Sequence, residues 1–269
     1  MRRRSKALAG VAVVVLVLVA AGLVLTLRDN ARPVTVQEAR SRTTTSVDAA
    51  GREPAPAAAR PEPGVYRYEG GGTEALSTPP LSQSQGPEMP ATVELTGDGC
   101  WSFRIDYSSN HWQDWEHCPE GDLVTEVGGS TWQRWMIGTS AITNLSTFVC
   151  EPGTPAFSLE PVDAQQRTGS CVGTREAVSG QTVSEGPYVD DGEQVLEVGG
   201  VEVRTRRYVS ERTMTGAQTG EERSTTWFAV ESGLPVRNER TLEVRTDTPI
   251  GPSTYTESGW FQLTDLRPA

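Results

Sequence analysis

The sequence predicts a mostly β domain, in which an antiparallel sheet curls into a barrel or half-barrel, preceded by one N-terminal transmembrane helix. Beyond residue 64, short runs of alternating apolar and polar residues are separated by turn residues, with no amphipathic helix pattern of ordinary length. Residues 201–208 place Val, Val and Thr on one face and Glu and Arg on the other, as in a sheet wetted on one side. Without a covering helix, the apolar face must curl on itself or pack against a second sheet, so a β-sandwich is the alternative.

The first element is an apolar segment at residues 7–27, which contains no charged residue. At about 1.5 Å per residue, a helix of this length is about 30 Å long and spans a bilayer. The basic residues precede the segment, so the positive-inside rule places residues 1–6 in the cytoplasm. A cleaved signal peptide fits less well, because the segment is long and no clear cleavage motif follows it. We therefore expect a single-pass protein of the cell membrane with an extracytoplasmic domain.

Residues 28–63 are rich in Ala, Pro, Arg and Thr and contain few apolar residues that could be buried. This composition predicts a disordered linker between the membrane segment and one domain at residues 64–269. In polyproline geometry, at about 3.1 Å per residue, the linker could reach on the order of 100 Å. It serves either as a spacer through a cell-wall layer or as a simple tether, and the sequence leaves both readings open.

The charge of the chain restricts its partners and its chemistry. There are 24 basic and 35 acidic residues, which give a formal net charge of −11. An acidic surface repels phosphate backbones, so we expect no nucleic-acid partner. Lys6, which precedes the apolar segment, is the one lysine in the sequence. The extracytoplasmic domain therefore has no lysine for a Schiff base or a general base.

The best-defined piece of the domain is a hairpin at residues 100–118. Its first strand alternates apolar and polar residues, and residues 108–110 have the composition of a turn. With a three-residue loop, a single register pairs aromatic with aromatic, Arg with Asp and Cys with Cys. The predicted pairs are Tyr107 with His111, Phe103 with Trp115, Arg104 with Asp114, and Cys100 with Cys118. Of the three connectivities of four cysteines, we favour the disulfides Cys100–Cys118 and Cys150–Cys171.

Further strands are expected along the rest of the domain, separated by turn residues such as the glycine pairs at 128–129 and 199–200. They are predicted at residues 122–127, 131–137, 146–150, 194–198, 201–212, 223–231, 236–246, 253–257 and 259–263. The alternation sends Trp101 and Trp115 to the core face of the hairpin and Trp112 to the opposite face. Trp112 is therefore a candidate for an exposed tryptophan that binds a ligand, such as a sugar.

No constellation of residues predicts an enzyme. The sequence has no G-x-S-x-G, S-x-x-K or H-E-x-x-H motif and no glycine loop for phosphates. Its two histidines, His111 and His117, lie six residues apart on one predicted strand, so we place them at the surface and about 20 Å from each other. The adjacent pair His117 and Cys118 is too little for a metal site. We expect no catalytic residue, no cofactor and no metal.

Residues 227–237, with the sequence WFAVESGLPVR, resemble the strand-turn-strand signature of the LolA/LppX-like lipoprotein-carrier superfamily. The resemblance implies a curved antiparallel sheet whose concave apolar face receives acyl chains, with Trp227 and Phe228 as candidate ligand contacts. The sequence departs from the family pattern in having no lipobox cysteine, no helix to cover the concave face, and two expected disulfides. In layout, the whole chain also resembles the membrane-anchored secreted proteins of actinobacteria.

These observations lead to two expectations about function. The first is a membrane-anchored extracytoplasmic binding module for a lipid or other apolar ligand of the cell envelope. The second is a structural or sensory ectodomain that binds a protein or glycan partner. Neither includes catalysis.

Overall fold

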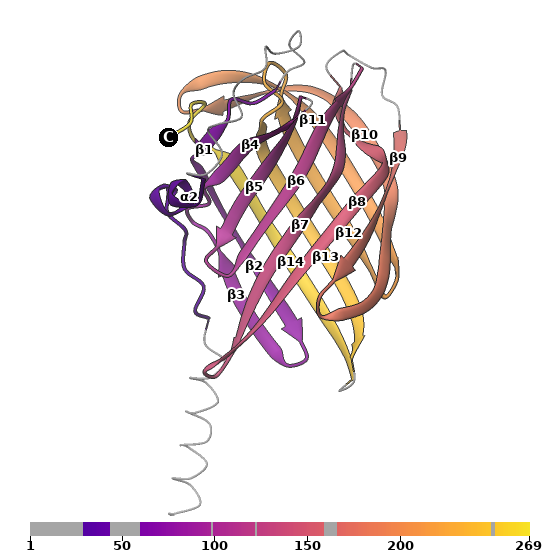
Figure 1. Ribbon diagram of the computed structural model, residues 1–269. Coiled ribbons are helices and arrows are strands. Elements are labelled where there is room, and N and C mark those ends of the chain that lie inside the picture. The colour runs from indigo at the N-terminus through magenta and orange to yellow at the C-terminus, as the bar shows by residue number, and fades with distance from the viewer. Residues whose placement is uncertain (1–28, 44–59, 98, 122, 159–165, 249–250) are drawn as a thin grey trace, which may run out of the picture.

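The computed structural model describes residues 29–43, 60–97, 99–121, 123–158, 166–248 and 251–269. Their strands form one 14-stranded antiparallel sheet in the order β1-β4-β5-β6-β7-β8-β9-β10-β11-β12-β13-β14-β2-β3. Figure 1 shows that this sheet curves strongly, so that its strands surround an interior. The predictions of a mostly β fold and of an antiparallel sheet are confirmed.

Most strands are long, and most neighbours in the sheet are also consecutive along the chain. The elements are α2 (Val36–Thr43), β1 (Gly64–Tyr66), β2 (Tyr68–Ser77), β3 (Pro80–Gln85), β4 (Ala91–Gly97), β5 (Cys100–Ser108), β6 (His111–Glu120), β7 (Leu123–Ile137), β8 (Ser140–Ser158), β9 (Gln166–Arg175), β10 (Val178–Val198), β11 (Val201–Gly216), β12 (Gln218–Ala229), β13 (Pro235–Thr248) and β14 (Gly251–Leu263). Such a meander of hairpins needs only short connections.

The strand order has two ends, β1 and β3, so the sheet is open. A closed barrel, one form of the prediction, is therefore wrong, and the strong curvature agrees with the half-barrel form. The second sheet of a β-sandwich is absent from the described part of the chain. Both edge strands are short, with three residues in β1 and six in β3, and no ladder among the described residues joins them. One isolated β-bridge joins Glu69 of β2 to Glu88, which lies between β3 and β4.

The interior side chains form three layers along the strand axes. On β13, Val236 lies in one apolar cluster, Arg240 lies in the middle, and Leu242 lies in a second apolar cluster. The same order recurs on β14 with Phe261, Glu257 and Tyr255, and on β11 with Tyr208, Arg212 and Met214. A layer of buried charged side chains therefore separates two apolar clusters, and its charges must be paired because burying an isolated charge is costly.

The hairpin β5–β6 follows the predicted register over most of its length, and both predicted disulfides are formed. Phe103 lies opposite Trp115, Arg104 lies opposite Asp114, and the disulfides join Cys100 to Cys118 and Cys150 to Cys171. The predicted pair of Tyr107 and His111 is wrong, because Ser108 lies opposite His111 and the turn has two residues instead of three. A bulge between Asp106 and Ser108 absorbs the extra residue and restores the register beyond it.

Part of the predicted linker is folded. Helix α2 begins with a capping box, in which the Glu38 amide donates to Thr35 Oγ1 at 3.2 Å and the Thr35 amide donates to Glu38 Oε2 at 2.9 Å. Val34 and Ala39 are each 1% exposed, so this segment does bury apolar side chains. The expectation of a disordered linker over residues 28–63 is therefore wrong for residues 29–43, while residues 44–59 lie outside the described part.

The predicted membrane helix at residues 7–27 also lies outside the described residues. Within the described ranges, no helix combines the length and the apolar character needed to cross a membrane. The cytoplasmic tail at residues 1–6 and the transmembrane segment therefore stay predictions from the sequence.

Candidate binding site

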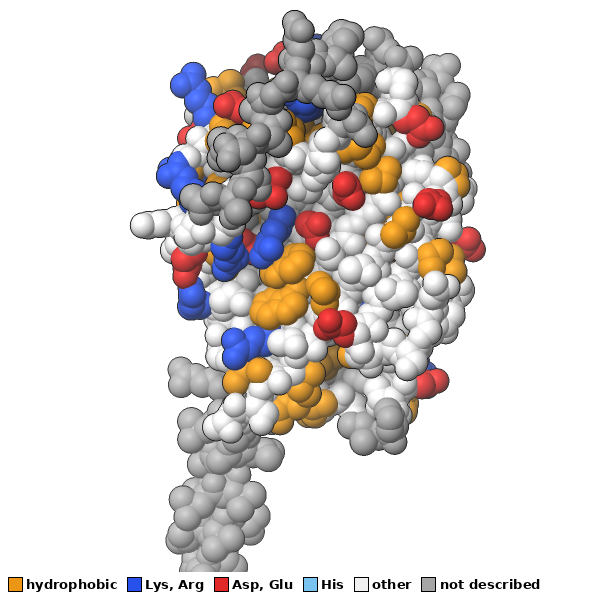
Figure 2. Space-filling view, viewed as in Figure 1, with side chains coloured by type: hydrophobic (Ala, Val, Ile, Leu, Met, Phe, Trp, Pro, Cys, Tyr) orange, Lys and Arg blue, Asp and Glu red, His pale blue; other side chains and the backbone are white. Residues whose placement is uncertain are grey.

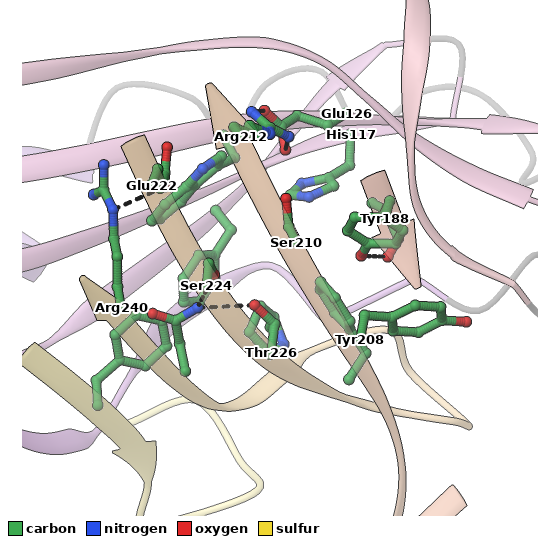
Figure 3. A pocket seen from close by; sticks show the side chains of 17 residues that line it. His117, Glu126, Tyr188, Tyr208, Ser210, Arg212, Glu222, Ser224, Thr226 and Arg240 are labelled. Atoms are coloured by element: carbon green, nitrogen blue, oxygen red, sulfur yellow. Dashed lines mark hydrogen bonds and ion pairs between the residues drawn. The ribbon is translucent and has the colours of Figure 1, made fainter. Parts of the chain in front are cut away.

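A cavity of about 70 Å³ lies inside the curved sheet, between β5–β8 on one side and β10–β14 on the other. Strand register brings its lining together: Ser210 of β11 lies opposite Ser224 of β12, and Thr226 of β12 lies opposite Asn238 of β13. Alternation along each strand turns these side chains inward, because opposite residues of an antiparallel pair share one face. Figure 3 shows the resulting site, with Glu222 and Arg240 at one side and Tyr188 and Tyr208 at the other.

The aromatic side of the cavity is made by phenylalanine and tyrosine rings, including Phe103 and Phe228. The rings of Tyr188 and Tyr208 stack with their centroids 5.2 Å apart. The Tyr208 hydroxyl accepts a hydrogen bond from the amide of Ser158 at 2.7 Å, and the Tyr188 hydroxyl donates to the carbonyl of Ala156. Burial raises the pKa of Tyr188 well above its usual range, so this side of the cavity is neutral.

The charged side of the cavity consists of paired groups. Arg212 lies 3.3 Å from Glu126, and Arg240 lies 2.9 Å from Glu222. Burial lowers the pKa of Arg212, but the charges of Glu126 and Glu222 outweigh burial, and the pKa is raised overall. Both guanidinium groups are therefore charged, and each faces a carboxylate. The cavity presents balanced charge instead of a cationic or anionic site.

His117 contributes to the cavity a ring nitrogen that lacks a hydrogen-bond partner among the described residues. Its side chain is 4% exposed, and its ring stacks on Trp101 with 4.3 Å between the centroids. Burial lowers the pKa of His117 to about 3, so the imidazole is neutral at physiological pH. Its Nδ1 has no hydrogen-bond partner among the described residues, and Figure 3 shows the ring beside Ser210. An unpaired buried polar atom costs about 1–3 kcal/mol, which a ligand atom or a water in the cavity would offset.

The polar layer continues beyond the cavity as an enclosed network. Tyr255 lies between two carboxylates, with its hydroxyl 2.8 Å from Glu74 Oε2 and 2.9 Å from Glu257 Oε2. His111 Nδ1 lies 3.2 Å from Glu74 Oε2. Burial, the largest influence, lowers the pKa of His111, but Glu74 and Glu257 outweigh it and the pKa is raised. Because His111 is 0% exposed and Glu74 is 1% exposed, this network holds the core together and is closed to a ligand.

The structure places the three predicted ligand contacts in three different environments. Phe228 lines the cavity. Trp227, the preceding residue, points to the opposite face of the sheet, where its Nε1 donates to Gln194 Oε1 at 2.8 Å. Arg207 and Arg237 lie over the Trp227 ring at 5.4 Å and 5.5 Å from its centroid. Trp227 is thus covered by polar side chains instead of lining an apolar concave surface.

Trp112 lies on the outer face, as predicted, but it is half-buried. The guanidinium of Arg104 covers its ring at 4.0 Å. Across the sheet, Trp112 lies opposite Trp132, which lies opposite Leu145. These three side chains form an apolar row over β6–β8, on the face where Figure 2 shows apolar side chains gathered with basic and acidic side chains beside them.

The prediction that both histidines lie at the surface is wrong, since both are buried. His117 shares its face with Trp115, two residues earlier, and this alternation could have assigned it to the interior. Arg212, Glu222 and Arg240 were also not identified from the sequence as interior residues of a binding site. Strand β12 is polar on both faces, so the period of two gives no signal for which polar side chains point inward.

One group of possible metal ligands occurs among the described residues, made of Glu126, Cys150 and Cys171. The two cysteines are joined in a disulfide, so neither sulfur is a thiolate that could bind a metal. The group therefore carries no metal site.

Comparisons with known proteins do not assign this chain to a family. No protein-family model matches the chain, and no curated protein matches it. Among solved structures, the hypothetical lipoprotein YmcC from Escherichia coli (K12) is 11% identical with a TM-score of 0.30, over 78% of this chain and 92% of that one. A TM-score this low carries no argument about function. The resemblance of residues 227–237 to the LolA/LppX-like superfamily therefore still rests on sequence. In the structure these residues form a strand, a turn with Gly233 at φ 67°, and a second strand.

Proposed function

We propose that this protein is a membrane-anchored extracytoplasmic binding module whose ligand is a small amphiphilic molecule of the cell envelope. Residues 7–27 would provide the anchor, and the cavity would hold the ligand. The observation that carries the proposal is the buried, neutral imidazole of His117, whose Nδ1 is unpaired among the described residues, in a cavity lined by aromatic rings, paired charges and a few uncharged polar side chains such as Ser210 and Asn238. An apolar lining with a few convergent polar groups is the usual composition of a ligand pocket.

The lining indicates the chemistry of the ligand. Its apolar part would contact Phe103, Phe228 and the stacked tyrosines. Its polar part would be an uncharged donor or acceptor, such as a hydroxyl or an amide, because a neutral imidazole can do either. A net charge on the ligand is disfavoured, since Glu126 and Glu222 are already paired with arginines.

The size of the cavity limits the ligand further. Its volume of about 70 Å³ is below the roughly 150 Å³ of a cavity that takes benzene. It is also below the roughly 300–1,000 Å³ of most small-molecule pockets. In the conformation described, the site accepts a small molecule or one end of a larger one. A lipid ligand would therefore insert its polar end or a chain end, and the rest would lie outside the cavity.

The proposal assigns no catalytic step. The acids and bases that line the cavity neutralise one another, and the glutamates near His111 are enclosed with it. A general acid or base must be within reach of a bound substrate, and the enclosed network has no such access.

The test is native mass spectrometry of the full-length chain, extracted from its host's membrane fraction in a mild detergent, followed by identification of any released molecule. We expect a stoichiometric small molecule with the unaltered protein. Ser210→Phe, which fills the cavity beside His117, should lose it. Val209→Phe is the matched control, because Val209 is the preceding residue on β11 and points to the opposite face. A clean ligand-free mass of the unaltered protein would contradict the proposal.

A glycan is the second candidate ligand, and one observation favours it. Trp260, 41% exposed, stands beside an open outer groove of about 730 Å³ that is also lined by Gly71, Arg237 and Gln262. A flat aromatic ring beside planar polar groups suits the faces of a sugar ring. Sedimentation with insoluble cell-wall polysaccharide should retain the unaltered chain and lose Trp260→Ala. Equal retention of both would rule out this groove.

A further inference from the structure

The first described residues of the chain are bound to one end of the sheet. Asp29 Oδ2 accepts a hydrogen bond from the amide of Ser84 at 2.8 Å. The side-chain amide of Asn110 donates to Asn30 Oδ1 at 3.0 Å. Asn110 belongs to the turn between β5 and β6, and Ser84 lies in β3, on the hairpin that turns at residues 78–79. Figure 1 shows this segment running from α2 toward the end of the sheet that carries the β2–β3 and β7–β8 turns.

Further contacts hold the same segment, residues 29–43, which we call the docked segment. The amide of Ser109 donates to the carbonyl of Arg32 at 2.7 Å. Farther along, Arg42 lies 3.1 Å from Asp106, a carboxylate that is 2% exposed. Val34 is buried at 1% exposure. The segment is thus fixed by hydrogen bonds, an ion pair and apolar contact.

This docking fixes where a membrane anchor would place the domain. The apolar run ends at Leu27, two residues before Asp29. Two residues span at most about 7 Å even when extended. If residues 7–27 cross the bilayer, the bound end of the sheet lies directly at the membrane surface, and no long spacer separates the two.

The charge of the two ends of the sheet differs in a way that fits this placement. At the bound end, the described residues between paired strands are Thr78, Pro79, Ser109, Asn110, Gly138, Thr139, Glu176, Ala177 and Ala217, of which Glu176 alone is charged. Within two residues of the turns at this end, the further charged residues described are Arg175 and Asp247, of opposite sign. At the opposite end, exposed acidic residues lie in turns or within two residues of them: Glu120, Glu197, Glu202 and Glu231. On the face in Figure 2, most acidic side chains likewise lie toward that opposite end.

Anionic lipid headgroups repel an acidic surface and tolerate an uncharged one. Ile142, which follows the turn at Gly138 and is 49% exposed, adds an apolar side chain that can enter the interface. We propose that the hairpin end, defined by the turns at 78–79, 109–110, 138–139 and 176–177, rests on the lipid surface, and that the docked segment holds it there. This inference relies on the membrane anchor of the proposed function and is independent of the cavity.

The experiment places one fluorescent label at either end of the full-length chain. All cysteines are in disulfides, so a single introduced cysteine takes the label. Ser140→Cys lies beside the turn at 138–139, and Ser232→Cys, the matched control, lies in the turn at the opposite end. Each protein is placed in nanodiscs of phosphatidylethanolamine and phosphatidylglycerol that contain a lipid with a nitroxide headgroup. Flotation with liposomes of the same lipids is measured first.

We expect the label at residue 140 to lose most of its fluorescence to the nitroxide and the label at residue 232 to keep it. Val34→Asp, which expels the docked segment, should restore fluorescence at residue 140 while the chain still floats. Arg42→Ala is a milder second variant if Val34→Asp disturbs folding. A floating chain without quenching at residue 140, or with equal quenching at both positions, overturns this inference alone. A chain that does not float overturns the membrane anchor and this inference together.

Discussion

The two histidines should respond to pH in opposite directions, because burial dominates one and neighbouring carboxylates dominate the other. His117 has a pKa lowered from 6.5 to about 3 by burial. Between these values the unfolded chain binds a proton at this position and the folded chain does not. The contribution of His117 to the free energy of unfolding is therefore complete above pH 6.5 and is lost as the pH falls.

The size of this effect follows from the shift. One pKa unit corresponds to about 1.4 kcal/mol, so the contribution declines by about 2 kcal/mol between pH 6.5 and pH 5. At pH 3 the total loss approaches about 5 kcal/mol. Domains are typically stable by roughly 5–15 kcal/mol, so we expect the loss at this one imidazole to be a measurable part of the total stability at acid pH.

The assay is urea unfolding of the full-length chain in detergent at several pH values from 5 to 7.5, for the unaltered protein and for His117→Phe. Phe keeps the ring stacked on Trp101 and cannot be protonated. The free energy of unfolding of His117→Phe should fall less steeply, as the pH is lowered from 7.5 to 5, than that of the unaltered chain. Comparing the two proteins removes the contribution of the carboxylates that titrate in both.

His111 provides the matched control. Its pKa is raised, because Glu74 and Glu257 outweigh burial. Its stabilising contribution is therefore present at low pH and is lost as the pH rises through the folded-state pKa, so His111→Gln should change the slope with the opposite sign. Since the chain has two histidines, imidazole NMR signals can be assigned with these same variants. Parallel stability curves, or a His117 signal that titrates near pH 6.5, would refute the reasoning.

Three further predictions concern stability. Arg240→Met should cost about 3–5 kcal/mol in urea unfolding because it leaves buried carboxylates unpaired, whereas Arg204→Met, which removes an exposed pair, should change little. Replacing Cys150 and Cys171 by serine should cost about 3 kcal/mol, and hydrogen exchange should rise in β8 beyond Val149, where pairing with β9 ends. Thr35→Ala should weaken α2 by about 1 kcal/mol, seen as faster amide exchange in residues 36–43, and unchanged exchange there would contradict the capping box.

The hairpin and its disulfide Cys100–Cys118 could be predicted because independent chemistries agreed on one register, and that pairing leaves Cys150 with Cys171. In the sequence, an aromatic pair, a pair of opposite charges and a cysteine pair point to one register of β5 and β6, and a slip of one residue would break all of them. In the structure, Arg104 lies opposite Asp114 but forms its ion pair with Asp106. The bulge at Tyr107 could not be foreseen, because it exchanges a three-residue loop for a two-residue turn and leaves the other pairs in place. The predicted side-chain pairs therefore could not distinguish a three-residue loop from a two-residue turn preceded by a bulge.

The candidate site was predicted less well, for a physical reason. Alternation identifies an inward face when that face is apolar, and it identified Trp101 and Phe103. It fails where the interior itself is charged, as at Arg212 and Glu222, since a polar inward face and a polar outward face look alike. Helix α2 was missed because its apolar contacts are few, although Thr35 and Glu38 carry the capping pattern.

The most direct test of the proposed binding site is an experimental density map of the full-length chain purified from its host membrane. The account predicts density for a bound molecule in the cavity, with a polar atom about 2.7–3.2 Å from His117 Nδ1 and an apolar part against Phe228 and Tyr208. A cavity that holds only water, or that side chains fill, would contradict the account.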